Sequence, residues 1–289
     1  MPKEAKYLFM RQWILAATLL LSSSGFSQRL EAGLFGGVSN YQGDLSGITF
    51  IGRFTKPALG LTLGYAISDR FSLRAGATWA SIESDDHYNP KEYLQVRNLR
   101  FQSKIKELSL LAVYRFFNSD DMRWSPYAFG GIALFHFNPY TKDSAGQIIN
   151  LRNLSTEGQG LEAYPDRKPY ALTQVSLPFG AGIRYDISPR MGIGIEAGIR
   201  KTFTDYLDDV SKSYVDPADL LAARGQQAVD YSYRSDEVAG GNAVYPEKGT
   251  QRGSEKQKDL YYFTGLHLTF KLGGGGGLGK GRSGCPRVN

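Results

Sequence analysis

The sequence predicts an all-β protein, specifically an eight-stranded antiparallel transmembrane β-barrel of the OmpA-like type with long outer loops. Three observations predict this fold class. Apolar and polar residues alternate along eight runs, the connections between the runs alternate between short and long, and a leader precedes the first run. Strands of alternating hydrophobicity, joined by short turns at one end and long loops at the other, are typical of outer-membrane barrels.

The composition of the 289 residues argues against several other classes of protein. Glycine contributes 34 residues and aromatic residues 13%, whereas charged residues make up only 21%. Disordered and coiled-coil chains carry more charge. The single cysteine excludes a disulfide framework and a cysteine-based zinc site, and the three histidines leave little for acid–base or metal chemistry.

The formal net charge of +6 is spread along the chain. A nucleic-acid-binding surface would need lysines and arginines clustered on one face. We therefore predict no nucleic acid partner, and we expect no cofactor, no small-molecule substrate and no enzymatic activity.

Residues 1–27 are predicted to form a signal peptide. Lys3, Lys6 and Arg11 give a positive first region, an apolar run over 13–21 follows, and small residues lead to a cleavage point after Ser27. The apolar run is too short for the alternative, a membrane-spanning anchor. The barrel is then expected over 28–272, in the outer membrane.

The eight predicted strands lie one after another along this range. The seventh is the clearest, because Ile193, Ile195 and Ile199 alternate with Glu196 and Arg200. The predicted ranges are 29–40, 57–67, 70–82, 104–117, 125–137, 173–186, 190–203 and 259–271.

The connections alternate in length in a way that fixes a topology. Those after the second, fourth and sixth strands are short, whereas residues 41–56, 83–103, 138–172 and 204–258 form long connections. Because the first strand follows the leader, the short turns are predicted to be periplasmic and the long loops to face outward. An even number of strands returns the C-terminus to the periplasm.

Aromatic side chains gather near the predicted strand ends. We expect them on the lipid-facing side as two girdles around an aliphatic band, since such rings prefer the headgroup level. The girdle beside the short turns would contain Tyr65, Phe71, Tyr114, Phe116, Tyr127, Tyr185 and Phe270. The outer girdle would contain Trp79, Phe135, Phe137, Phe203 and Tyr262.

Charged residues fall on the inward face of the predicted strands. An eight-stranded barrel encloses only enough room for side chains, and buried charges of mixed sign tolerate burial when they pair. We therefore predict a plugged lumen with a charge network, for which a gate or proton path is the functional alternative. Its members would be Glu31, Arg74, Glu107, Arg115, Arg184, Glu196 and Arg200.

The fourth outer loop and the tail carry further expectations. Residues 205–210 should continue the wall above the membrane, and Asp216 should cap a short helix over 216–224. Residues 225–258 look polar and mobile, and 273–289 form a Gly-rich, flexible periplasmic tail. Asp205, Asp208 and Asp209 offer the hard oxygens that Ca²⁺ prefers, but their spacing matches no EF-hand loop.

Two segments resemble a known family. One contains Tyr41, Gly43, Asp44 and Leu45 at the end of the first strand. The other leaves the seventh strand as Phe203, Thr204, Asp205, Tyr206, Leu207, Asp208 and Asp209. Together with the closing strand over 259–271, they make the chain similar to the PorG-type outer-membrane barrels of the Bacteroidota. The resemblance extends to about residue 272 and leaves the Gly-rich tail outside it.

The resemblance implies a component of the type IX secretion system. Barrels of this type are linked to a periplasmic ring made of the PorK lipoprotein and PorN, and they anchor it to the outer membrane. Two alternatives stay open. One is a generic OmpA-like structural barrel or small porin. The other is a lipid-modifying barrel enzyme, for which His87, His136 and His267 show no adjacent nucleophile and carboxylate in the sequence.

Overall fold

The computed structural model describes residues 29–46, 52–117 and 122–272. The predicted signal peptide and the predicted tail over 273–289 lie outside these ranges. Ten strands are present. They are β1 (Leu30–Gln42), β2 (Lys56–Ala66), β3 (Phe71–Asp85), β4 (Arg100–Arg115), β5 (Trp124–His136), β6 (Pro139–Lys142), β7 (Ile148–Asn150), β8 (Thr173–Ser188), β9 (Met191–Thr202) and β10 (Leu260–Lys271).

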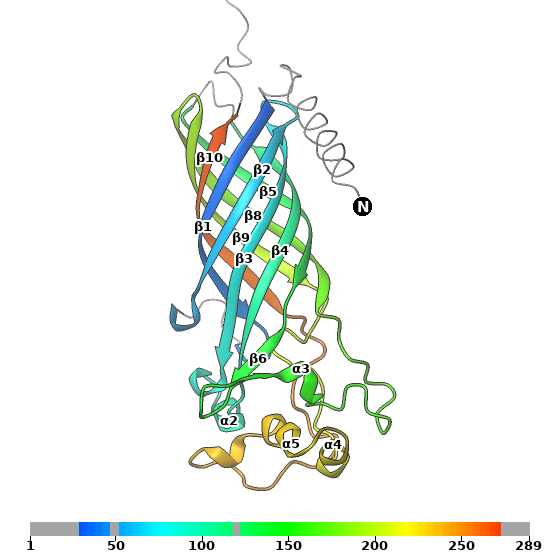
Figure 1. Ribbon diagram of the computed structural model, residues 1–289. Helices are drawn as coiled ribbons and strands as arrows, with labels where there is room; N and C mark the ends of the chain where they lie inside the picture. The colour runs from blue at the N-terminus through cyan, green and yellow to red at the C-terminus, as the bar shows by residue number, and fades with distance from the viewer. Residues whose placement is uncertain (1–28, 47–51, 118–121, 273–289) are drawn as a thin grey trace, which may run out of the picture.

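Eight of these strands close into an antiparallel barrel (Figure 1). The hydrogen-bonded order is β3-β2-β1-β10-β9-β8-β5-β4, and β3 pairs with β4 to complete the ring. The first and last strands are in register from Glu31 opposite Lys271 to Gln42 opposite Leu260. The fold class and the eight strands are therefore confirmed. Strands β6 and β7 were not predicted, and they form a short hairpin at the edge of β4.

Short connections gather at the end of the barrel where β1 begins and β10 ends, and long ones gather at the other end (Figure 1). The turn between β8 and β9 contains only Pro189 and Arg190, whereas residues 203–259 connect β9 to β10. The predicted alternation of connection lengths is confirmed. We call the two ends the terminal end and the cap end.

The outward face of the barrel is a band of exposed aliphatic side chains. Leu59 is 64% exposed, Leu108 64% and Ile195 64%, although each lies within a strand. A contiguous apolar surface of this extent is covered by lipid in the native protein. Among the described residues, no helix is long and apolar enough to cross a membrane.

Three members of the predicted aromatic girdles face inward instead. Tyr127 is 5% exposed and donates a hydrogen bond to Glu196, and Phe135 and Phe137 are both fully buried. Strand β5 is apolar on both faces, because Ile132 and Leu134 cover the lipid side while these aromatic rings fill the lumen. Hydrophobic alternation therefore could not separate its two faces. The other predicted girdle residues are exposed or half-buried.

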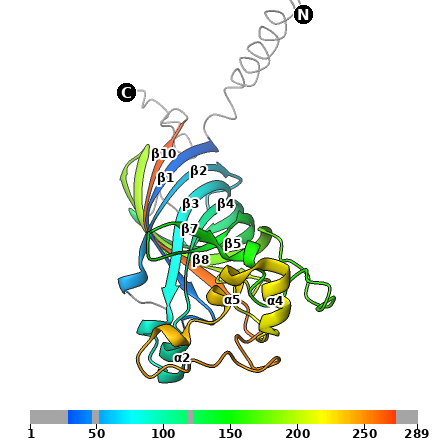
Figure 2. The same ribbon diagram turned by 60° about the horizontal axis from the view of Figure 1, so that its bottom comes forward.

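The long connections fold over the cap end of the barrel into a structure that we call the cap (residues 43–46, 52–55, 86–99, 137–172 and 203–259). Figure 2, in which this end comes forward, shows α2, α4 and α5 lying across it. Its helices are η2 (Gly52–Phe54), η3 (Asp86–Tyr88), α2 (Glu92–Arg97), α3 (Leu151–Leu154), α4 (Pro217–Arg224), α5 (Gln226–Ser232) and η4 (Ser235–Glu237).

The fourth loop is more ordered than expected. Asp216 caps α4 as predicted, with its carboxylate accepting a hydrogen bond from the amide of Ala218 at 2.8 Å. The expectation of a mobile stretch over 225–258 is wrong, because it forms α5 and η4 and buries Arg252. The largest cluster of buried apolar side chains spans the cap and the adjoining part of the lumen.

Candidate functional site

Charged side chains fill the lumen in three groups. At the terminal end, Glu31 accepts hydrogen bonds from Arg184 at 2.9 Å and Arg115 at 3.2 Å. In the middle, Arg74 Nη1 lies 2.7 Å from Glu196 Oε2. Nearer the cap, Arg200 Nε lies 3.3 Å from Glu107 Oε2, which also accepts a hydrogen bond from Tyr261 at 2.8 Å.

The structure thus brings all seven predicted lumen charges into pairs of opposite sign. Only a cavity of about 20 Å³ remains around Arg74, Glu196 and Arg200. A space of that size holds about one water molecule. The paired side chains therefore fill the part of the described lumen that they line.

His267 lies in the same part of the lumen, beside a hydroxyl and a carboxylate. Its Nε2 is 2.9 Å from Thr62 Oγ1, and its Nδ1 is 3.9 Å from Glu196 Oε2. Arg74 donates a hydrogen bond to Nδ1 at 3.1 Å, so the ring proton resides on Nε2 and points to Thr62. A nucleophile–base pair needs the opposite direction, with the hydroxyl donating to the ring. This arrangement serves packing, and the sequence spacing gave no sign of it.

The two segments of the family resemblance meet in the cap. The Tyr41 hydroxyl lies 2.6 Å from Asp208 Oδ2 and 3.0 Å from Asp259 Oδ1. Asp259 also accepts a hydrogen bond from the Leu207 amide at 2.9 Å, and Asp208 accepts one from the Val210 amide at 2.9 Å. The end of β1, the segment after β9 and the start of β10 are therefore held together.

Gly43, Asp44 and Leu45 complete the first segment. A Cβ on Gly43 would collide with Asp259 and Tyr41, so no side chain fits there. Asp44 accepts a hydrogen bond from the Ser254 amide at 2.9 Å, and the buried Leu45 accepts one through its carbonyl from the Ser84 hydroxyl at 3.1 Å. These residues join the first loop to the end of β3 and to the fourth loop.

The second segment is also structural. Asp209 accepts hydrogen bonds from Thr156 at 2.5 Å and Tyr170 at 2.6 Å, which attach the fourth loop to the third. Tyr206 stacks on Tyr170 with ring centroids 4.7 Å apart. Of the remaining members, Thr204, Asp205 and Leu207 are buried and Phe203 is exposed.

The three aspartates considered for Ca²⁺ do not converge. Asp208 and Asp209 contact different loops, and neither carboxylate oxygen of the buried Asp205 has a hydrogen-bond partner among the described residues. Burial raises the pKa of Asp205 to about 7 and that of Asp209 to about 6. Within the described ranges, no three His, Cys, Asp or Glu side chains are grouped to hold a metal ion.

Two arginines that sequence reasoning missed, the partly buried Arg97 and the buried Arg252, connect the loops from within. Arg97 is paired with Asp86 at 2.6 Å and donates to the Arg252 carbonyl at 2.6 Å. Arg252 is paired with Glu157 at 3.0 Å and donates to the Asp209 carbonyl at 2.8 Å. Neither lies on a strand, so no alternation marks it in the sequence.

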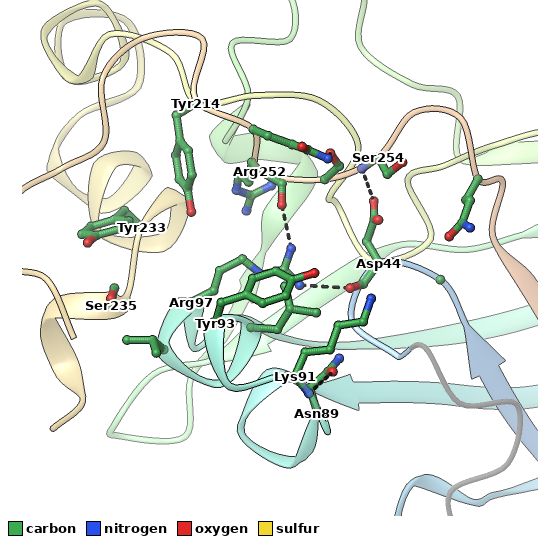
Figure 3. A pocket seen from close by; sticks show the side chains of 16 residues that line it. Asp44, Asn89, Lys91, Tyr93, Arg97, Tyr214, Tyr233, Ser235, Arg252 and Ser254 are labelled. Atoms are coloured by element: carbon green, nitrogen blue, oxygen red, sulfur yellow. Dashed lines mark hydrogen bonds between the residues drawn. The ribbon is translucent and has the colours of Figure 1, made fainter. Parts of the chain in front are cut away.

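The two arginines also line a pocket of about 490 Å³ in the cap (Figure 3). Lys91, Tyr93 and Arg97 line it from the segment of α2, whereas Tyr214 and Arg252 line it from the fourth loop. The volume is in the range of small-molecule sites. None of our sequence predictions pointed to it.

The comparison with protein families identifies the family to which the chain belongs. The family described as "Domain of unknown function (DUF6089)" matches residues 10–222, more than half of the 289 residues. The chain belongs to the DUF6089 family. The matched range includes β1 to β9, and so it contains both Tyr41 and Asp208 of this DUF6089 barrel. No curated protein matches the sequence significantly.

Solved structures similar to this DUF6089 barrel include outer-membrane proteins. Neisserial surface protein A is 10% identical, with 84% of this chain and 96% of that chain covered and a TM-score of 0.40. OprG from Pseudomonas aeruginosa is 12% identical, with 84% and 97% covered and a TM-score of 0.36. The outer membrane enzyme PagL is 10% identical, with 83% and 98% covered and a TM-score of 0.31. At these identities the likeness concerns the fold alone.

The exposed aliphatic band decides the environment of the DUF6089 barrel. Leu59, Leu108 and Ile195 would face water in a soluble protein, at a cost of about 1.5–3 kcal/mol for each large apolar side chain left exposed. Closed β-barrels with such a band reside in outer membranes. The protein is therefore an outer-membrane β-barrel.

Proposed function

We propose that this protein is a non-enzymatic, sealed anchor in the outer membrane and a component of the type IX secretion system. The observation that carries the anchoring role is the filled lumen. Three groups of paired charges leave a cavity of only about 20 Å³, and the cap covers one end. A barrel of this kind supplies a fixed surface in the membrane and no route for cargo.

The secretion role rests on the resemblance to PorG-type barrels in the segments around Tyr41 and Asp208. In the described structure these segments have a structural task, since they hold the loops together. They support a cap architecture shared with PorG-type barrels. We propose that the two kinds of barrel also share a partner. That partner is the periplasmic ring of PorK and PorN type.

The terminal end, which we assign to the periplasm, offers a surface for such a partner. Arg29, Arg70, Arg123 and Arg190 are exposed there, each just before a strand, and Asp69 is an exposed acid among the residues that the structure describes at this end. A rim of this sign attracts an acidic protein surface. Anionic phospholipid headgroups would be attracted as well, so the experiment has to distinguish binding of a partner protein from binding of headgroups.

The experiment combines export with co-purification. Deletion of the gene should abolish secretion of type IX cargo, and the tagged barrel should recover the ring proteins from detergent-solubilised membranes. The Arg123→Glu, Arg190→Glu double variant should lose the ring proteins, whereas Lys168→Glu, an exposed charge reversal in the cap, should retain them. Normal export in the deletion strain would reject the secretion role and leave a general structural barrel.

A further inference from the structure

The pocket in the cap has chemistry that the anchoring role does not use. Its walls come from segments far apart in the sequence, with α2 on one side and residues 251–257 with Tyr214 and Tyr233 on the other (Figure 3). The Arg97 guanidinium donates a hydrogen bond to the Arg252 carbonyl at 2.6 Å, which joins the two walls, and ion pairs with Asp86 and Glu157 fix the two arginine side chains. The pocket is therefore built on buried, well-fixed groups.

The charges that face the pocket are mainly positive. Lys91, Arg97 and Arg252 line it, whereas Asp86 and Glu157, the partners of the two arginines, are not among the lining residues. Lys91 has no anionic partner within the described part of the chain. The lining carboxylate of Asp44 accepts a hydrogen bond from the Ser254 amide, and burial raises its pKa.

Two buried groups have donors left over for a ligand. The hydrogen bonds of Arg252 to other described residues use Nε and Nη1, so Nη2 is not engaged. Tyr214 is only 4% exposed, yet its hydroxyl makes no hydrogen bond to any described residue. Figure 3 shows both side chains at the pocket. The Tyr214 hydroxyl is therefore available to water or to a ligand in the pocket.

The remaining lining is aromatic and amidic. Lys91 Nζ lies over one face of the Tyr93 ring, 6.0 Å from its centroid, and the 67% exposed ring offers its other face to a ligand. Tyr214 and Tyr233 meet edge to face with centroids 5.9 Å apart. Gln251 donates its amide to the Gly253 carbonyl, which leaves its own oxygen free to accept. Aromatic faces pack against the C–H groups of a sugar ring, while hydroxyls require nearby donors and acceptors.

We infer that the pocket binds an acidic saccharide, in which a sugar ring packs on Tyr93 and its carboxylate or phosphate is held by Lys91 and Arg252. Arginine and lysine form charge-assisted hydrogen bonds with such anions. An apolar ligand does not suit this lining, and a neutral sugar would leave Lys91, which lies over the Tyr93 ring, without an anionic partner among the described residues. The inference is independent of the secretion role, because it concerns the opposite end of the barrel.

The test is titration of the refolded mature protein in detergent with trigalacturonate, and with maltotriose as the neutral comparison. Trigalacturonate should bind, and maltotriose should bind at least about tenfold more weakly because it lacks the charge. Tyr93→Ala and Lys91→Gln should each weaken trigalacturonate binding by about tenfold. Both residues are exposed, so the variants should fold, which heat-modifiable gel mobility checks.

Lys168→Gln, an exposed lysine of the third loop outside the pocket, is the matched control and should bind as the unchanged protein does. Flotation with lipopolysaccharide vesicles identifies the source of the saccharide. If Tyr93→Ala and Lys91→Gln weaken binding to the vesicles, the ligand is a lipid-linked saccharide. If they weaken binding of trigalacturonate alone, the ligand is a free saccharide. Equal binding of both trisaccharides would overturn the inference. It would also be overturned if neither trigalacturonate titration nor vesicle flotation shows binding that Tyr93→Ala and Lys91→Gln weaken.

Discussion

The Tyr41 hydroxyl lies 2.6 Å from Asp208 Oδ2, and this contact joins two residues 167 positions apart in the chain. Both residues are fully or almost fully buried, and Asp259 lies 3.0 Å from the same hydroxyl. Burial and the neighbouring carboxylates raise the pKa of Asp208 and Asp259 well above the ordinary value. A single tyrosine thus connects the first strand to the fourth loop.

Removal of this hydroxyl should loosen the cap. Tyr41→Phe leaves Asp208 Oδ2 without its hydroxyl donor and should lower the free energy of unfolding by about 1–3 kcal/mol. Denaturant unfolding in phospholipid vesicles measures the change. Tyr65→Phe, on the lipid-facing side of β2, removes a hydroxyl outside the cap and should change the stability little. Equal effects of the two substitutions would mean that the contact contributes nothing specific.

The ion pair between Arg74 and Glu196 in the lumen should show strong coupling. Glu196→Ala leaves Arg74 buried without its carboxylate and should cost about 3–5 kcal/mol of unfolding free energy. The double variant Arg74→Met, Glu196→Leu replaces the pair with apolar volume and should recover most of that loss. A double-mutant cycle with purely additive effects would show that the two side chains act independently.

The assignment of lipid-facing and inward residues predicts different responses to substitution on the two faces of the barrel wall. Ile195→Arg places a charge in the lipid-facing band and should cost about 2–4 kcal/mol. Gly64→Ala is an inward control, because its new Cβ would lie 3.6 Å from Glu31 Cβ, an ordinary packing distance. Its effect on assembly into vesicles should be small. A harmless Ile195→Arg would reverse the assignment of the two faces.

The stability of the cap should depend on pH through Asp205. Its pKa rises from 3.8 to about 7 in the folded state because of burial, so the folded protein binds more protons than the unfolded chain between these values. The contribution of Asp205 to stability is therefore greatest below about pH 4 and falls as the pH rises to about 7. Asp205→Asn should reduce this fall, whereas the exposed substitution Asp236→Asn should not. The free energy of unfolding of both variants is measured across this pH range. A pH dependence of Asp205→Asn equal to that of the unchanged protein would contradict the prediction.

The barrel itself could be predicted from the sequence because its strands have one lipid-facing and one inward face. Ile193, Ile195 and Ile199 alternate with Glu196 and Arg200, and a period of two identifies both the strand and its orientation. Strand β5 marks the limit of this reasoning. Tyr127, Phe135 and Phe137 are apolar residues on the inward side, where they pack in the lumen.

The cap could be predicted only in fragments. The Asp216 cap of α4 is a local signal, and the segments around Tyr41 and Asp208 were noticed through a family resemblance. Arg97, Glu157 and Arg252 have no local signature, because their partners lie 11 and 95 positions away along the chain. The pocket lined by Tyr93 and Tyr214 depends on these long-range contacts, so it becomes visible only after the loops are assembled.

Conductance of lipid bilayers that contain the mature protein tests the sealed barrel most directly. Insertion is verified first, through quenching of Trp79 and Trp124 fluorescence by brominated lipids, since both rings face outward. With insertion established, the charge pairs in the lumen predict no stable conductance above that of the lipid alone. A large, steady conductance that scales with the amount of inserted protein would contradict the sealed anchor.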